Sequence, residues 1–153
     1  MRFVTFEHEA GHHIGAVIGN GVVDLNAADL RLPNDMGAYL RGRGALADLV
    51  KIANSAKVQH TFPLNTIKHC LPVRDPGKIF CLGLNYLEHV KEGNNQVVDY
   101  PTISDKLDFE AELVLVIGKR IRHATKETAL SAIAGYSCFN DGTLRDYQRR
   151  TTQ

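Results

Sequence analysis

Residues 107–118, with the sequence LDFEAELVLVIG, have the pattern of a β-strand. Polar and apolar residues alternate at the start, and an unbroken apolar run then ends at a glycine. Because successive side chains of a strand point to opposite faces, Glu110 and Glu112 share one face. A strand that is apolar on both faces is normally buried on both. The segment therefore predicts a central strand that carries two neighbouring carboxylates into the protein.

Two like charges at positions i and i+2 are costly to bury unless a positive group lies between them. The simplest such group is a hard divalent cation, bound by the oxygens of Glu110 and Glu112. Asp141 follows another predicted strand and is the natural third oxygen ligand. If a helix begins there, Arg145 and Gln148 project from the same side as Asp141. Their guanidinium and amide groups would then bind the acid group of a substrate.

Composition gives few clues to function. The 153 residues are 44% hydrophobic and 23% charged, as in an ordinary soluble globular protein. The formal net charge of +1 gives no electrostatic reason to expect a nucleic acid or an anionic membrane as partner. No apolar run is long enough to span a bilayer, and the N-terminus does not resemble a signal peptide. Cys70, Cys81 and Cys138 have apolar neighbours, and we expect reduced core cysteines of a cytoplasmic protein.

The first part of the chain predicts a small α/β domain at residues 1–72. Residues 2–6 and 12–25 have the pattern of two or three strands, with a hairpin turn at Gly19-Asn20-Gly21. Asn34 or Asp35 is expected to cap a short helix, and residues 45–52 have apolar positions at helical spacing. The three prolines of residues 63–76 are typical of a domain boundary.

The remaining residues, 73–153, predict a second domain. Residues 78–83 and 136–139 are expected to be short buried strands, and residues 125–135 a helix capped by Thr125. After the first of these strands, His89 and Glu92 are three residues apart, and on a helical turn they would lie on one side. They would act as a general acid/base dyad if they face a cleft. Spacing alone favours the alternative, an ordinary surface pair.

Three histidines near the N-terminus, His8, His12 and His13, suggest a metal site. His12 and His13 are adjacent, so on a strand they point to opposite faces and cannot bind one ion together. We expect solvated histidines at the edge of a strand.

The chain resembles the fumarylacetoacetate hydrolase family, whose members are metal-dependent enzymes acting on 2-oxo acids. Three motifs of that family occur here in order and at similar spacing. They are Gly83-Leu84-Asn85-Tyr86 with His89 and Glu92, then Glu110-Ala111-Glu112, then Asn140-Asp141 with Arg145-Asp146-Tyr147-Gln148. The resemblance implies an α+β protein in which the small domain precedes a mixed β-sandwich or β-roll catalytic domain, incomplete in this chain.

The resemblance also implies roles for single residues. It implies Mg²⁺ or Mn²⁺ bound by Glu110, Glu112 and Asp141. It places the pair His89 and Glu92 on a lid that closes over a small 2-oxo acid. The substrate contacts that it implies are Tyr86, Arg145 and Gln148. Members of the family are commonly homodimers.

The implied reaction is hydrolysis of a C–C bond in an acylpyruvate, through an enolate that the metal stabilises. Decarboxylation, isomerisation or hydration of a 2-oxo acid uses the same intermediate and is the alternative within the family.

The chain departs from the family's pattern in two places. The stretch between Ile103 and the Glu-x-Glu strand is shorter than in relatives, and relatives continue past Gln153, so we expect part of a longer enzyme. In the other alternative, the chain is an inactive fragment that serves as a binding or oligomerisation module.

Overall fold

A computed structural model describes residues 1–9, 11–82 and 102–148. The chain divides into two compact units. The first comprises Met1–Lys78 and Ile117–Gly135, and the second comprises Ile79–Val116 and Tyr136–Gln153. Tyr86, His89 and Glu92 lie outside the described residues. The described helices include none that is both long and apolar enough to cross a membrane.

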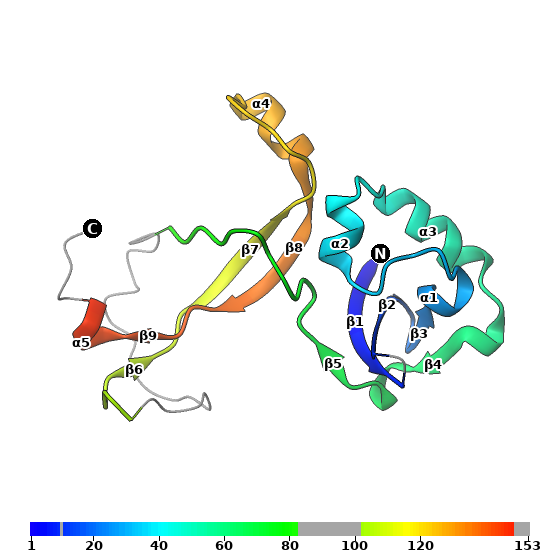
Figure 1. The fold of residues 1–153 in the computed structure, drawn as a ribbon, viewed down its shortest axis with the longest axis horizontal. Coiled ribbons are helices and arrows are strands. Elements are labelled where there is room, and N and C mark those ends of the chain that lie inside the picture. The colour runs from blue at the N-terminus through cyan, green and yellow to red at the C-terminus, as the bar shows by residue number, and fades with distance from the viewer. Residues whose placement is uncertain (10, 83–101, 149–153) are drawn as a thin grey trace. The chain divides into compact units, whose positions relative to one another are not determined.

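The first unit is built on a five-stranded antiparallel sheet in the order β4-β3-β2-β1-β5 (Figure 1). Gly19 has a φ of 58° in the turn that pairs Ile18 with Gly21, so the hairpin prediction is confirmed. The strands are β1 (Arg2–His8), β2 (Gly11–Ile18), β3 (Gly21–Asp24), β4 (Thr61–Pro63) and β5 (His69–Cys70).

Three helices follow the first hairpins: α1 (Leu25–Ala28), α2 (Met36–Arg41) and α3 (Leu46–Ser55). The last two confirm the predicted helices, and Asp35 caps α2 by accepting a hydrogen bond from the backbone N–H of Ala38 at 2.8 Å. The sequence did not predict α1, which Asp24 caps in the same way. Two short 3₁₀ turns, η1 (Val58–His60) and η2 (Leu64–Thr66), flank β4.

The sheet has an apolar core on each face. On one face, residues of β2 and β3 pack against the three helices (Figure 1), and this core consists of Ile14, Ala16, Val23, Leu25, Met36, Tyr39, Leu49 and Ala53. On the other face, Phe6, Val17 and Val22 are covered by Leu64 and Ile67 from the segment between β4 and β5. Both faces of the central strands β1 to β3 are therefore packed.

Substitution of Leu49 by alanine is expected to destabilise the first unit by about 2–5 kcal/mol, because Leu49 is fully buried in the helix-side core. Urea denaturation of the two proteins measures the difference. Leu30→Ala is the matched control, since the Leu30 side chain is 89% exposed, and it should leave the midpoint nearly unchanged. Equal midpoints for Leu49→Ala and the wild-type protein would contradict the packing described here.

Residues 107–148 form two small sheets and three short helices. In one sheet β6 (Leu107–Asp108) pairs with β9 (Thr143–Leu144), and in the other β7 (Ala111–Ile117) pairs with β8 (Ile133–Asn140). Figure 1 shows the second pair as a long ribbon with α4 (Lys126–Ala129) at its far end, followed by η3 (Leu130–Ala132). Thr125 caps α4, as predicted, and Thr128 completes a capping box. The predicted helix is shorter than expected, because β8 already begins at Ile133.

The opening strand is present, but its predicted burial on both faces is wrong. Burial alternates along β7: Glu112, Val114 and Val116 are half-buried, whereas the other face is exposed. The prediction that residues 78–83 form a buried strand is also wrong, because residues 78–82 have no strand structure and are exposed. Burial of 136–139 is wrong as well, since much of this part of β8 is exposed. Apolar side chains are buried only where other elements cover them, and within the described residues β7 and β8 form a sheet of only two strands.

The cysteines differ from the sequence prediction for the same reason. Cys70 is partly buried in the edge strand β5, whereas Cys81 and Cys138 are exposed. All three are free thiols, as expected. Cys81 lies in the extended segment after Lys78, where an apolar sequence context predicted burial that the structure does not provide.

Candidate functional site

The candidate site lies where β7 begins and the chain leaves β8, within the second unit. The backbone N–H of Asp141 donates to the carbonyl of Glu110 at 2.9 Å, and the N–H of Arg145 donates to the carbonyl of Lys106 at 2.9 Å. Between these two bonds, β6 and β9 pair in antiparallel register, with Asp108 opposite Thr143. Main-chain pairing therefore brings the Glu-x-Glu segment next to the segment that carries Asp141 and Arg145.

The Arg145 guanidinium is the positive centre of this site. Its Nε donates to Asp108 Oδ2 at 2.8 Å, and its Nη1 donates to Glu110 Oε1. The three side chains are 25%, 20% and 14% exposed, so the pairs are only partly screened by water. Burial by itself lowers the pKa of Arg145, but the hydrogen bond to Asp108 and the charge of Glu110 outweigh it and raise the pKa above its usual value. Arg145 is therefore a permanent cation.

Gln148 lies beside this cation. Arg145 Nη1 donates to Gln148 Oε1 at 3.1 Å, so the two predicted substrate contacts are neighbours. The predicted helical relation to Asp141 is wrong, because α5 (Arg145–Gln148) begins four residues after Asp141. The structure places Asp141 in the connection before β9 instead. Pairing of β6 with β9, and not helical periodicity, brings Asp141 and Arg145 to the same site.

Asp141 lies beside the thiol of Cys81. A hydrogen bond to Asp141 is the largest cause that raises the pKa of Cys81, followed by burial and by the negative charges of Asp141, Glu112 and Glu110. The main-chain hydrogen bond from Asp141 to Glu110 places these two residues next to each other, and Glu112 follows Glu110 by two residues. Asp141, Glu110 and Glu112 are all half-buried.

Three carboxylates on these neighbouring segments suit a hard divalent cation by their donor chemistry. The sequence predicted that Glu110 and Glu112 need a positive group between them, and Arg145 supplies part of that charge to Glu110. The carboxylate oxygens are not drawn tightly together: within the described ranges, the one trio of possible ligand atoms lying within 4.8 Å of one another is elsewhere, at His8, His13 and Asp24. A cation at Glu110, Glu112 and Asp141 would therefore compete with Arg145 for Glu110.

Sequence reasoning missed Asp108, which holds Arg145 from the other side. The signal was present, because Asp108 precedes Glu110 by two residues, the same spacing that singled out Glu110 and Glu112. It also missed the trio at His8, His13 and Asp24, because only the neighbours His12 and His13 were compared. The structure places His13 in a buried position, so the expectation of a solvated edge histidine is wrong for that residue.

Known proteins share this arrangement of sequence and fold. The family model for the C-terminal part of fumarylacetoacetate hydrolase matches residues 93–153. The structure superposes on a fumarylacetoacetate hydrolase from psychrophilic Exiguobacterium antarcticum with a TM-score of 0.75 at 22% identity, over 98% of this chain and 58% of the other. At that identity the likeness establishes a shared α+β fold.

Two curated relatives are more similar in sequence. A fumarylacetoacetate hydrolase domain-containing protein 2 homolog from Dictyostelium discoideum is 33% identical over 175 aligned residues, which span 98% of this chain and 57% of the relative. The human mitochondrial protein named oxaloacetate tautomerase FAHD2A is 33% identical over 98% of this chain and 55% of its own length. The chain belongs to the fumarylacetoacetate hydrolase family. It spans somewhat more than half the length of these relatives.

Proposed function

We propose that the chain is part of an enzyme that interconverts the keto and enol forms of a small 2-oxo dicarboxylic acid of the oxaloacetate type. The observation that carries this proposal is the main-chain pairing that places Asp141 next to Glu110 beside the Arg145 cation, in a family whose relatives at 33% identity include named oxaloacetate tautomerases. Tautomerisation needs only a proton transfer and a stabilised enolate, so it is the least demanding reaction for such a site.

In this proposal the acidic residues would bind the metal ion and the basic residue would bind the substrate. Mg²⁺ or Mn²⁺ bound by Glu110, Glu112 and Asp141 would supply positive charge beside the 2-oxo oxygen, where negative charge develops. Arg145 would bind a substrate carboxylate through its planar fork, with the Gln148 amide beside it at 3.1 Å. Asp108 accepts a hydrogen bond from Arg145 Nε at 2.8 Å and so helps to orient the guanidinium. The proton would be moved by His89, oriented by Glu92, and Tyr86 would contact the substrate; these three lie outside the described residues.

Hydrolysis of a C–C bond in an acylpyruvate is the second candidate. It begins with the same charge development at the 2-oxo oxygen, and it is supported by the family model, whose description names a hydrolase. The difference between the two reactions lies in whether water attacks the neighbouring acyl carbon.

One experiment separates these candidates. The purified protein is given oxaloacetate, with loss of the enol followed by ultraviolet absorbance, and separately an acylpyruvate, with release of pyruvate as the readout. Rates with Mg²⁺ alone are subtracted, because free cations also promote enolisation. Enol conversion that requires both protein and Mg²⁺, without pyruvate release, supports tautomerisation. Pyruvate release supports hydrolysis, and the absence of both reactions would contradict the proposed function.

We also propose the wider organisation implied by the family. Residues 1–72 would form the small domain, and residues 73–153 the first part of a β-roll or β-sandwich catalytic domain. The exposed apolar side of β7, with Leu113 at 60% and Ile117 at 57% exposure, supports coverage by further strands or by a second copy in a cytoplasmic homodimer.

A further inference from the structure

The hairpin of β1 and β2 and the adjoining strand β3 bring three ligand-type side chains to one face of the first sheet. His13 lies directly opposite Phe6, and His8 follows Phe6 by two residues on the same strand face. Asp24 lies opposite Gly15, which follows His13 by two residues on that face. His8 and Asp24 are therefore the two diagonal neighbours of His13, one on each side.

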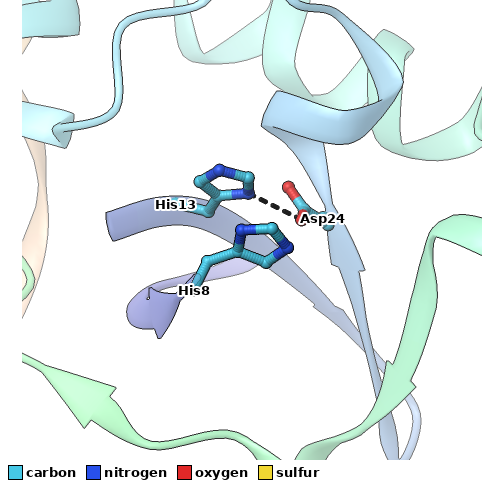
Figure 2. A group of neighbouring side chains, drawn as sticks. All are labelled: His8, His13 and Asp24. Atoms are coloured by element: carbon cyan, nitrogen blue, oxygen red, sulfur yellow. Dashed lines mark hydrogen bonds and ion pairs between the residues drawn. The ribbon is translucent and has the colours of Figure 1, made fainter. Parts of the chain in front are cut away.

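The three side chains are in close contact (Figure 2). His13 Nδ1 lies 2.7 Å from Asp24 Oδ2, and the imidazole of His8 stacks on that of His13 with ring centroids 4.0 Å apart and planes inclined by 13°. One possible ligand atom from each residue lies within 4.8 Å of the other two. Asp24 is fully buried and His13 is 9% exposed, whereas His8 is exposed at the end of β1. Two members of the cluster are thus buried, and solvent reaches the cluster on the side of His8.

The surrounding contacts fix the buried members. Asp24 Oδ1 accepts the backbone N–H of Ala27 at 3.0 Å as the cap of α1, which leaves Oδ2 to face His13. The edge of Phe6 packs against the His13 ring at a centroid distance of 6.0 Å. Groups that orient ligand side chains from behind are a regular feature of metal sites. The side chain of His8 is exposed at the end of β1, so a change of its rotamer would not disturb the core.

A structural role explains two members of the cluster. A fully buried carboxylate needs a hydrogen-bonded partner, and His13 supplies one. That role needs no third residue, yet His8 adds a second imidazole against the same pair. Two imidazoles and one carboxylate are a donor set for Zn²⁺ and similar ions, with a coordination position left for water.

We propose that His8, His13 and Asp24 bind one transition-metal cation of the Zn²⁺ type, in place of the proton shared by His13 and Asp24. Two ligands of a tetrahedral Zn²⁺ lie about 3.3 Å apart, so the 2.7 Å pair must open slightly and the His8 ring must turn toward it. The bound ion would join β1, β2 and β3 at the edge of the sheet core. The donor set differs from the all-oxygen set at Glu110, Glu112 and Asp141, so the two sites would select different cations.

The test is a Zn²⁺ titration of the purified chain by calorimetry in excess Mg²⁺, which occupies sites made only of carboxylates. We expect one equivalent of Zn²⁺ per chain in the wild-type protein, and Co²⁺ should give the visible absorption of a tetrahedral complex. His8→Ala removes an exposed ligand without touching the core, and the affinity should fall by more than about tenfold. His12→Ala is the matched control, because the His12 ring contacts Arg74 at 2.8 Å and does not belong to the trio.

The Zn²⁺ affinities of the His8 and His12 variants together test the proposal. Loss of Zn²⁺ affinity in His8→Ala but not in His12→Ala supports it, and Zn²⁺ should then raise the melting temperature of the wild-type protein but not of His8→Ala. Equal affinities in the two variants, or no Zn²⁺ bound by the wild-type protein, would overturn it. His8→Gln repeats the comparison if His8→Ala does not give folded protein. The outcome is independent of the reaction proposed above, because no step of that reaction uses these residues.

Discussion

Replacement of Glu110 by glutamine is expected to reduce turnover of a 2-oxo acid by at least about 100-fold. Loss of a group that only orients a metal ligand typically costs 10- to 100-fold in affinity or activity, so loss of a direct ligand costs at least the upper value. Glutamine keeps the shape of Glu110 and can still accept a hydrogen bond from Arg145, but it removes the negative charge that holds a cation. The measurement is kcat/KM as a function of Mg²⁺ concentration.

Asp105→Asn is the control for a general loss of negative charge in this region. The side chain of Asp105 is 80% exposed and its ion pair with Lys106 is long, at 3.3 Å, so this variant should retain wild-type activity. Raising the Mg²⁺ concentration should partly restore Glu110→Gln, because its defect is in cation affinity. Full turnover of Glu110→Gln in chelator-treated buffer would show that no metal acts at these carboxylates.

The second large effect is expected at Arg145. Its removal leaves Asp108 and Glu110 close together without their shared cation, and it removes the proposed contact to the substrate carboxylate. Truncating one member of a hydrogen-bonded charge pair costs about 2–5 kcal/mol, and partial exposure places Arg145 at the lower end. For Arg145→Ala we therefore expect kcat/KM to fall roughly 30- to 150-fold, which corresponds to about 2–3 kcal/mol.

Arg145→Lys separates charge from geometry. Lysine keeps the positive charge but lacks the planar guanidinium, so it should still pair with Glu110 and bind the substrate carboxylate more weakly. We therefore expect a raised KM and a smaller change in kcat. Arg31→Ala is the control, since Arg31 pairs with its neighbour Asp29 at an exposed position. An unchanged KM in both Arg145 variants would exclude Arg145 as a substrate contact.

Local patterns in the sequence predicted the first strands and the helices α2 and α3 of the first unit, but not α1 or the edge strands β4 and β5. The hairpin at Gly19 depends on residues adjacent in the chain, and the same holds for the Asp35 cap of α2. The burial of residues 78–82 and of β7 depends instead on what covers them. A strand pattern shows that the side chains are apolar, but it does not show whether another layer of structure covers them. The predicted burial was wrong there for that reason.

In the candidate site, too, the residue types could be identified from local sequence, whereas contacts between distant segments could not. The sequence predicted Glu110, Glu112 and Asp141 as metal ligands from their residue types and positions, and main-chain pairing places Asp141 next to Glu110. The partnership of Arg145 with Asp108 was not predicted, because it follows from strand register between segments 37 residues apart. The trio at His13 was missed for a similar reason: contacts across a hairpin depend on register, which adjacent residues alone do not reveal.

The central claim is that the carboxylates at the start of β7 and after β8 bind a hard divalent cation. A Mn²⁺ titration followed by electron paramagnetic resonance tests it most directly, because free Mn²⁺ gives a signal that weakens on binding. Zn²⁺ at one equivalent is included to occupy the separate site proposed at His13. We expect one Mn²⁺ per chain, displaced by excess Mg²⁺ and lost in Glu110→Gln but not in Asp105→Asn. Undiminished Mn²⁺ binding by Glu110→Gln, or none by the wild-type protein, would contradict it.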